Sequence, residues 1–337
     1  MRRRIAALIL MAAMALTLPG CTAGTSPTTV PDESQAGDTA EKVESLSSSS
    51  SDTNESESDA GKVSDASEEG KDKEILDIIS KMTPAQKLSQ MMIVALRSDP
   101  GNTKTATKIS EDYANLLRQY DFGGIILFAG NMTDVAQTVT LIRDSQDAAM
   151  SSEAGIPMFV YVDQEGGMVN RVSFGTTSSG NMALAATGNI SLTEESAKML
   201  GDEIKALGFN MDFAPVSDVN SNPANPIIGV RSFSDDPEIA AEYVTAFMKG
   251  LDSAGISAAF KHFPGHGNVG EDSHTHLPCS DFSLEEIKKC DLIPFQAGID
   301  QGTDMIMTAH IQYPQIEKET YVSVQDNQEI CLQDWGN

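Results

Sequence analysis

Residues 258–267 read AAFKHFPGHG, an apolar run that ends in two polar residues and a turn. A continuous apolar run indicates a strand that is covered on both faces, as in a parallel sheet. Pro264 cannot continue a helix, and the glycines that follow it allow tight backbone turns. The segment therefore predicts a buried strand that presents Lys261 and His262 at its carboxyl end.

Five further short apolar runs occur along the chain, separated by amphipathic helical stretches. We expect six strands, at residues 92–95, 125–128, 158–162, 211–215, 258–262 and 305–308. Helix starts are indicated by Thr83 with Pro84, Ser191 with Glu194, and Ser283 with Glu286. A helix after Thr193 should end at Gly208, and another, from about residue 237 to 253, at Gly255. Strands that alternate with helices are typical of parallel sheets built from βα units.

Polar residues gather where the predicted strands end, and they include Asn131, Asp163, Gln164, Glu165, Asp218, His262 and His310. The active site of a (β/α)8 barrel is assembled at this face of the sheet. We therefore expect an α/β fold of the (β/α)8 TIM-barrel type. A doubly wound open sheet is the competing architecture, but the glycine-rich phosphate turn that normally follows its first strand is not visible.

The number of predicted strands is too small for a closed barrel of this type. Six parallel strands cannot close, and their edges would present unpaired backbone groups. We expect a barrel truncated after about six βα units, or one that something else completes.

The N-terminal residues 1–21 have the pattern of a lipoprotein signal peptide. Three arginines precede an apolar run from Ile5 to Leu18, and Cys21 follows. A run of about 14 residues is too short for the roughly 20 that span a bilayer. We predict lipidation at Cys21 and a location outside the cytoplasm, anchored to the bacterial cell membrane. Ordinary secretion with a free Cys21 is the alternative.

Residues 22–71 are rich in Ser, Thr, Asp, Glu and Gly and contain no aromatic residue. Such a segment cannot bury enough apolar surface to fold, so we expect a disordered linker before a folded domain over residues 72–337. The formal net charge of −26 argues against nucleic acid as a partner and leaves membrane contact to the lipid anchor alone. Three further cysteines, Cys279, Cys290 and Cys331, have no metal-like spacing and are expected to be buried free thiols.

Three segments carry side chains suited to chemistry. Asp272 precedes His274 by two residues, where its carboxylate can accept the imidazole N–H and raise the basicity of the ring. The other two are Asp163 to Gly167 with Arg171, and residues 225–233 with Arg231. Charged residues at strand ends, with glycines nearby, suit hydrogen bonding to sugar hydroxyl groups.

These segments, in this order together with residues 261–267, resemble family 3 glycoside hydrolases. The Asp-Ser-His loop at residues 272–274 is similar to the β-N-acetylglucosaminidase branch of that family, and the resemblance spans roughly residues 75 to 325. It implies a retaining exo-acting hydrolase, without a cofactor, whose substrate is a glycan with terminal N-acetylglucosamine, such as a cell-wall glycan.

The resemblance also implies roles for individual residues. His274 matches the general acid/base and Asp272 its orienting partner. The positions that hold the sugar are matched by Asp163, Arg171, Arg231, Lys261 and His262. A histidine with a pKa near 6.5 can serve both proton transfers near neutral pH.

The nucleophile of the family is the point of departure. It lies in a segment that resembles Gly-x-Val-x-Ser-Asp on a later strand, and nothing after His310 matches. Asp218 imitates the pattern but lies on the fourth strand, so we interpret it as structural or pocket-lining. We therefore expect little or no turnover from these 337 residues alone.

Other functions stay open at this point. His262, His266, His274 and His276 have spacings that could serve zinc, but residues 264–265 forbid the helix on which ligands four residues apart usually rely. A β-glucosidase-type hydrolase of the same family is another possibility. A third is a non-catalytic glycan-binding lipoprotein or an inactive fragment.

Overall fold

The computed structural model describes residues 65–98, 105–273, 277–318, 321–325 and 328–332. The predicted signal peptide, with Cys21, and most of the predicted linker lie outside these residues. Helix α1 (Asp65–Lys81) begins seven residues before the boundary expected at residue 72. Its glutamates and lysines are good helix formers, so the helix extends into the end of the segment whose composition predicts disorder.

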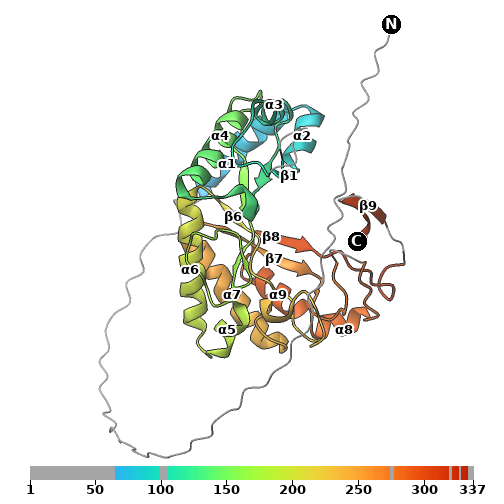
Figure 1. Cartoon of the computed structure of the whole chain (residues 1–337). Coiled ribbons are helices and arrows are strands. Elements are labelled where there is room, and N and C mark those ends of the chain that lie inside the picture. Colours follow the sequence, from blue (N-terminus) through green and yellow to red (C-terminus); the bar gives the residue numbers. More distant parts are fainter. Residues whose placement is uncertain (1–64, 99–104, 274–276, 319–320, 326–327, 333–337) are drawn as a thin grey trace, which may run out of the picture. The chain divides into compact units, whose positions relative to one another are not determined.

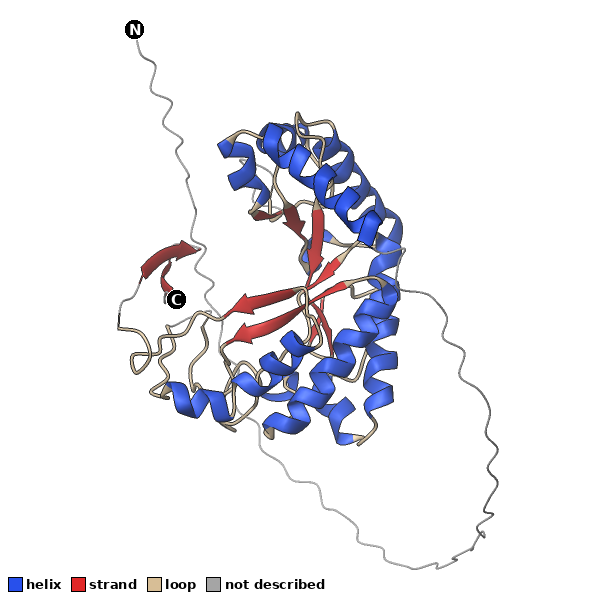
Figure 2. Cartoon of the chain, turned by 180° about the vertical axis from the view of Figure 1, so that it is seen from behind, coloured by secondary structure: helices blue, strands red, loops and turns tan. Residues whose placement is uncertain are grey.

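The centre of the fold is a six-stranded parallel sheet in the order β1-β2-β3-β6-β7-β8 (Figures 1 and 2). The strands are β1 (Ile93–Ala95), β2 (Gly124–Ile126), β3 (Phe159–Val162), β6 (Met211–Asp212), β7 (Ser257–Phe263) and β8 (Met305–Thr308). All six predicted strands are confirmed, and their order in the sheet is their order along the chain. The carboxyl ends of all six strands therefore meet at one edge.

Helices cover one face of this sheet (Figure 2). Besides α1, the helices of the described residues are α2 (Pro84–Gln90), α3 (Glu111–Tyr120), α4 (Val135–Met150), α5 (Asn181–Ala186), α6 (Ile190–Leu207), α7 (Pro237–Ala254), α8 (Leu284–Lys289) and α9 (Leu292–Asp300). Short 3-10 turns are η1 (Ala129–Asn131) and η2 (Gly229–Arg231). Two small antiparallel hairpins, which the apolar pattern did not predict, are β4 (Gln164–Gly166) with β5 (Val169–Asn170), and β9 (Tyr321–Gln325) with β10 (Gln328–Leu332).

The packing of α6 against α7 shows how the sequence builds the outer layer. Ala197, Leu200, Ile204 and Leu207 are buried, as their helical spacing predicts, and Gly208 ends α6 in the left-handed conformation. The two helices approach so closely that a Cβ atom at Gly250 would lie 2.3 Å from the backbone oxygen of Glu194. Only glycine allows this contact, because real Cβ atoms do not approach other atoms so closely.

Most of the predicted helix ends are confirmed, with one exception. Thr83 and Ser283 each form a capping box, with Gln86 and Glu286, and Gly255 ends α7. The prediction of Ser191 as an N-cap is wrong, because the N-cap of α6 is Asn189, two residues earlier, and the helix begins at Ile190. The turn at Gly188, with a positive φ, redirects the chain just before that point, and this turn sets the helix start ahead of the serine.

The edges of the sheet are β1 and β8, and each pairs with only one neighbouring strand among the described residues. Within the described part of the chain no helix is both long and apolar enough to cross a membrane.

Cys279 is exposed and Cys290 half-buried, so the prediction of buried thiols is wrong for Cys279, which lies in the loop before α8. Cys331 lies in β10, and its side chain is outside the described part.

Candidate functional site

A buried lysine joins two strand ends at the carboxyl edge of the sheet. Lys261, near the end of β7, has a side chain that is only 2% exposed. Its Nζ lies 2.8 Å from Oδ1 of Asp163, which follows β3, and 2.6 Å from Oε1 of Glu165 in β4. The register of β7 with β8 shifts between Lys261 and Phe263, an irregularity of the kind that re-aims side chains at sheet edges. The cluster thus joins residues almost 100 positions apart in the sequence.

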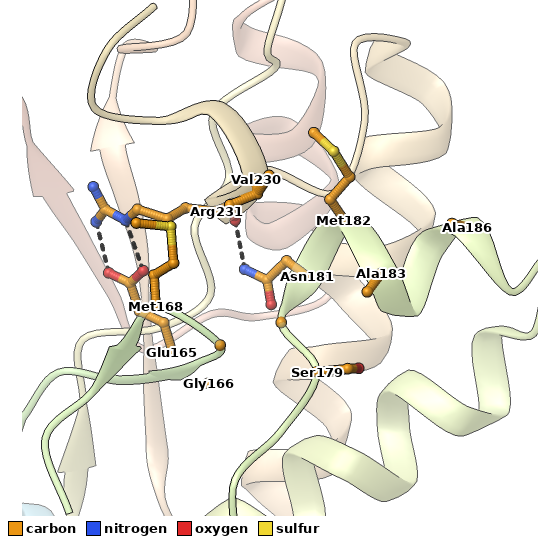
Figure 3. Close-up of a pocket in the computed structure, with 12 residues that line it drawn as sticks. Glu165, Gly166, Met168, Ser179, Asn181, Met182, Ala183, Ala186, Val230 and Arg231 are labelled. Carbon is orange, nitrogen blue, oxygen red and sulfur yellow. Dashed lines mark hydrogen bonds and ion pairs between the residues drawn. The ribbon is translucent and has the colours of Figure 1, made fainter. Parts of the chain in front are cut away.

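Arg231 in η2 completes this cluster from a separate loop. Its Nε and one terminal nitrogen donate hydrogen bonds to the two carboxylate oxygens of Glu165, at 2.9 and 2.7 Å (Figure 3). Its other terminal nitrogen donates to the carbonyl of Ile227 at 3.1 Å. A bidentate pair of this kind fixes both position and orientation. We name Asp163, Glu165, Arg231 and Lys261 the charged cluster.

Glu165, Arg231 and Lys261 hold one another in the ionised form. Burial would raise the pKa of Glu165, but the charges and hydrogen bonds of Lys261 and Arg231 outweigh it and lower that pKa to about 2. Burial would lower the pKa of Lys261, but Glu165 and Asp163 raise it above its ordinary value. At neutral pH the cluster therefore presents fixed charges at the strand ends.

Asp218 holds the next residue of β7, His262. Its carboxylate is fully buried and accepts from Nδ1 of His262 at 2.7 Å and from two backbone N–H groups, of His262 at 3.2 Å and His266 at 2.6 Å. Burial would raise the pKa of Asp218, but the contacts with His262 and His266 lower it. A carboxylate at Nδ1 places a proton there, so Nε2 of His262 is the nitrogen left for a ligand.

His266 connects the turn after β7 to the following loop. Its Nε2 lies 2.9 Å from Oγ of Ser273, while its Nδ1 is buried without a hydrogen-bond partner among the described residues. The proton is therefore best placed on Nε2, where Ser273 can accept it. Burial lowers the pKa of His266, which favours the neutral ring.

The loop that carries Arg231 is tied to the same turn through Asn225. The amide nitrogen of Asn225 donates to the carbonyls of His266 and Val269, at 2.7 and 2.9 Å. Its amide oxygen accepts from the backbone of Ile227 and Ile228. Two of the segments singled out in the sequence are thus fastened together by one side chain.

The structure brings together most of the predicted sugar-binding residues. Asp163, Arg231 and Lys261 meet in the charged cluster, and His262 adjoins Lys261. Arg171 shares no described hydrogen bond or ion pair with them, and its Nε is buried without a partner in the described part of the chain. Asp272 is half-buried, and His274 lies outside the described residues, so the predicted acid/base pair is not tested.

Sequence reasoning missed the part that Glu165 plays. Glu165 contacts both cations of the cluster, yet the sequence placed it only among the polar residues at strand ends and in the block at 163–167, without a role in sugar binding. Alternation was the available signal, because side chains two positions apart in an extended segment point to the same side. Asp218 was interpreted as structural or pocket-lining, and its contact with His262, 44 positions away, has no local signal.

Asp212 is a third buried carboxyl in this region. Its Oδ1 accepts from the backbone N–H of Gln164 at 2.9 Å, and its Oδ2 has no partner among the described side chains. Burial raises the pKa of Asp212 to about 7.

Among the described residues no group of three or more His, Cys, Asp or Glu side chains is placed to hold a metal ion, and His274 and His276 lie outside them.

The chain matches a known family of proteins. The family model described as glycosyl hydrolase family 3 N terminal domain matches residues 83–330. The chain therefore belongs to glycoside hydrolase family 3, and its sheet is part of the TIM-barrel type of fold predicted from the sequence.

Two curated relatives show how much of the chain is shared. Beta-hexosaminidase A of Pseudoalteromonas piscicida is 40% identical over 259 residues, which are 72% of this chain and 43% of that protein. Beta-hexosaminidase of Stenotrophomonas maltophilia strain K279a is 37% identical over 220 residues, which are 63% of this chain and 64% of that protein. The chain thus spans less than two thirds of the length of these relatives.

Solved structures show the same likeness. A family 3 β-N-acetylglucosaminidase from Paenibacillus sp. strain FPU-7 matches with a TM-score of 0.66 and 40% identity, over 71% of this chain and 44% of that one. NagZ from Neisseria gonorrhoeae, in complex with N-trifluoroacetyl-D-glucosamine, matches with a TM-score of 0.60 and 30% identity, over 66% and 64% of the two chains.

Proposed function

We propose that the chain is the sugar-binding part of a retaining exo-β-N-acetylglucosaminidase that acts on cell-wall glycans outside the cytoplasm. The observation that carries the proposal is the convergence of Asp163, Arg231 and Lys261 on one edge of the sheet, beside His262. Charged groups that are fixed in place suit the hydroxyl groups of a single terminal sugar. The names of the relatives, beta-hexosaminidase and β-N-acetylglucosaminidase, support this sugar class.

In the proposed reaction an aspartate would attack the anomeric carbon while His274 protonates the leaving oxygen, and water would then release the sugar. Asp272 would orient His274. The charged cluster and His262 would hold the sugar without taking part in bond breaking. None of these steps requires a cofactor.

The sequence has no segment after His310 that resembles the nucleophile motif, so we separate binding from turnover in the test. The 337-residue chain should bind N-acetylglucosamine in calorimetry and release little or no chromophore from an aryl N-acetyl-β-glucosaminide. Turnover that matches a complete hexosaminidase would contradict the second expectation. Absence of binding would overturn the proposed function itself.

A second candidate is a non-catalytic glycan-binding lipoprotein, in which the charged cluster would hold a sugar without turnover. The two candidates differ when the chain is followed by a segment that supplies the aspartate. The hydrolase then gains chromophore release, and His274→Ala abolishes it. A binding protein stays inactive with either histidine or alanine at that position. Assaying the aryl β-glucoside in parallel distinguishes the β-glucosidase alternative.

We also propose that the protein is exported and lipid-anchored. Three arginines, the apolar run from Ile5 to Leu18 and Cys21 support this location. Expressed in bacteria, the protein should take up radiolabelled fatty acid and stay with the membrane fraction. Cys21→Ala should lose both properties, and unchanged labelling would contradict the anchor.

A further inference from the structure

Arg231 and His262 reach the proposed sugar site from different kinds of segment. His262 lies in β7, a strand of the parallel sheet. Arg231 lies in η2, a 3-10 turn of three residues, so its position depends on the loop around it. A loop that has to be ordered when a ligand binds weakens the binding. The contacts that hold this loop before a sugar arrives therefore bear on affinity.

Asn225 is a buried amide in that loop, and its residue is only 8% exposed. Its Nδ2 donates to the carbonyls of His266 and Val269, at 2.7 and 2.9 Å. Its Oδ1 accepts from the backbone N–H groups of Ile227 and Ile228, at 2.9 and 2.7 Å. Carbonyls only accept and N–H groups only donate, so these contacts fix the orientation of the amide. They also use its full hydrogen-bonding capacity and leave none for a ligand.

Two of these contacts shape the segment that holds Arg231. A terminal nitrogen of Arg231 donates to the carbonyl of Ile227 at 3.1 Å. That carbonyl and the N–H of Ile228 belong to one planar peptide group. Asn225 and the guanidinium of Arg231 thus hold opposite ends of the same rigid unit. The backbone N–H of Arg231 also donates to the carbonyl of Ile228, at 2.9 Å.

The other two contacts hold the turn that follows His262. His266, whose carbonyl accepts from Asn225, donates its own N–H to Oδ1 of Asp218 at 2.6 Å. The second oxygen of Asp218 lies 2.7 Å from Nδ1 of His262. Ser232 adds a separate tie, since its Oγ donates to the carbonyl of Asp218 at 2.6 Å. A continuous series of contacts therefore runs from the arginine loop to the imidazole, with Asn225 at its centre.

We propose that Asn225 is a positioning residue that holds Arg231 and His262 at the spacing required to bind one sugar. The inference rests on the proposed function and adds to it a residue that does not itself contact the sugar. Without the amide, the sugar would have to order the loop and the turn as it binds, and its affinity would fall. A residue with a merely structural role would lower stability and leave the affinity of the folded chain unchanged.

The first test is calorimetry of the full chain with N-acetylglucosamine, at a temperature where circular dichroism shows every variant to be folded. Asn225→Ala should weaken the dissociation constant about tenfold, because a loop that was held in advance then has to be ordered on binding. Asn222→Ala is the matched control. Asn222 lies in the same loop and donates to the carbonyl of Asn268 in the same turn at 3.4 Å, but its side chain does not hold the peptide group that Arg231 contacts. This variant should leave the dissociation constant unchanged.

Asn225→Asp separates the two sides of the asparagine. It keeps an oxygen for the two backbone N–H groups of the loop and loses both donors to the turn. In nuclear magnetic resonance spectra without sugar, the Nε–H signal of Arg231, protected by its bond to Glu165, should persist in Asn225→Asp and be lost in Asn225→Ala. The ring nitrogen shifts of His262 should change in both variants. The affinity of Asn225→Asp should lie between those of wild type and Asn225→Ala, and this variant carries the test if the alanine variant does not fold.

The outcomes separate the positioning role from the proposed function. Sugar affinity equal to that of wild type in a folded Asn225 variant, or equal weakening by Asn222→Ala, would overturn the positioning role and leave the proposed function standing. Arginine and histidine signals that stay unchanged in both Asn225 variants would do the same. Wild type that binds no sugar would instead overturn the proposed function.

Discussion

The strand ends around Lys261 and the turn around Gly265 both bury a carboxylate, but they treat its charge in opposite ways. Glu165 lies between two cations, and although burial alone would raise its pKa, their charges lower it to about 2. Asp291, at the start of α9, accepts a hydrogen bond from the amide of Asn268 at 3.1 Å, and burial raises its pKa to about 7. Equal burial thus gives an ionised acid in one region and an acid that is half-protonated near neutral pH in the other.

This difference in charge distinguishes the strand ends around Lys261, where we propose that the sugar binds, from the turn around Gly265, which supports them. Burying a charge costs several kcal/mol unless a partner of opposite sign is present, so a buried ion cluster indicates a use for charge at that place. At the turn around Gly265, Asp291 lies against the backbone between His262 and His266 and accepts its hydrogen bond from a neutral amide, not from a cation.

Removing the central cation should have the largest effect. Lys261→Met leaves Asp163 without its lysine partner and Glu165 with Arg231 alone, so we expect a loss of about 3 kcal/mol in the free energy of unfolding and no measurable sugar binding. Denaturant titration and calorimetry measure the two effects. Lys198→Met removes an exposed pair with Asp202 and should cost less than about 1 kcal/mol. Equal losses of unfolding free energy in the two variants would show that the buried ion pairs of Lys261 stabilise the fold no more than an exposed pair does.

Filling the space at Gly265 should have the next largest effect. Gly265 has φ of 139°, and a Cβ atom there would lie 2.6 Å from Cβ of Asp291. Gly265→Ala should therefore cost about 2 kcal/mol or more, from backbone strain and the displaced turn. Gly302→Ala is the matched control, because its φ is 83° and nothing lies near its added Cβ. If thermal unfolding gives the same loss for both variants, the close approach to Asp291 has no energetic role.

Asp218→Asn should change the proton on His262. The new amide keeps an oxygen for the backbone N–H groups, but its nitrogen then faces Nδ1 and forces the proton to Nε2. We expect affinity for the sugar to fall about tenfold, with a stability loss of about 1–3 kcal/mol. Nitrogen chemical shifts of the His262 ring report the tautomer directly. Unchanged shifts in the variant would refute the positioning role, and Asp202→Asn serves as the exposed control.

The pH dependence of stability tests the second carboxylate of the comparison, Asp291. In the folded chain the pKa of Asp291 is raised by burial to about 7, from 3.8 in the unfolded chain. Between these values the folded chain binds more protons, so this group makes stability fall as the pH rises. Asp291→Asn should flatten that fall. Parallel curves for wild type and variant between about pH 4 and about pH 8 would contradict it.

Glu165 changes the stability with pH in the opposite direction to Asp291, because the pKa of Glu165 is lowered in the folded chain. Its contribution to stability is complete above about 4.5 and is lost as the pH falls towards about 2. An acid titration of wild type should therefore show a loss of stability in this window. The loss should be reduced in Glu165→Gln, and an identical acid limb in that variant would argue against the ion pairs.

Local patterns in the sequence predicted the main features of the fold. Apolar runs located all six strands of the sheet, because strands covered on both faces need continuous apolar residues. The hairpin of β4 and β5 was missed, since its two strands have three and two residues, which is too short for a periodic signal. The start of α6 was placed wrongly because a serine with a favourable spacing was outweighed by the turn at Gly188.

The sequence predicted which residues form the site but not which of them contact one another. Lys261, His262, Asp163 and Arg231 were identified from their segments. The contact between Lys261 and Glu165 and the contact between His262 and Asp218 depend on the order of strands in space. No local pattern contains that information.

The central claim is that the charged cluster and His262 surround one sugar at the carboxyl edge of the sheet. A crystal structure of the chain soaked with N-acetylglucosamine tests it most directly. We predict hydroxyl groups of the sugar within hydrogen-bond distance of Asp163, Lys261 and Nε2 of His262. A sugar bound at any other surface, with these side chains left unchanged, would contradict the account.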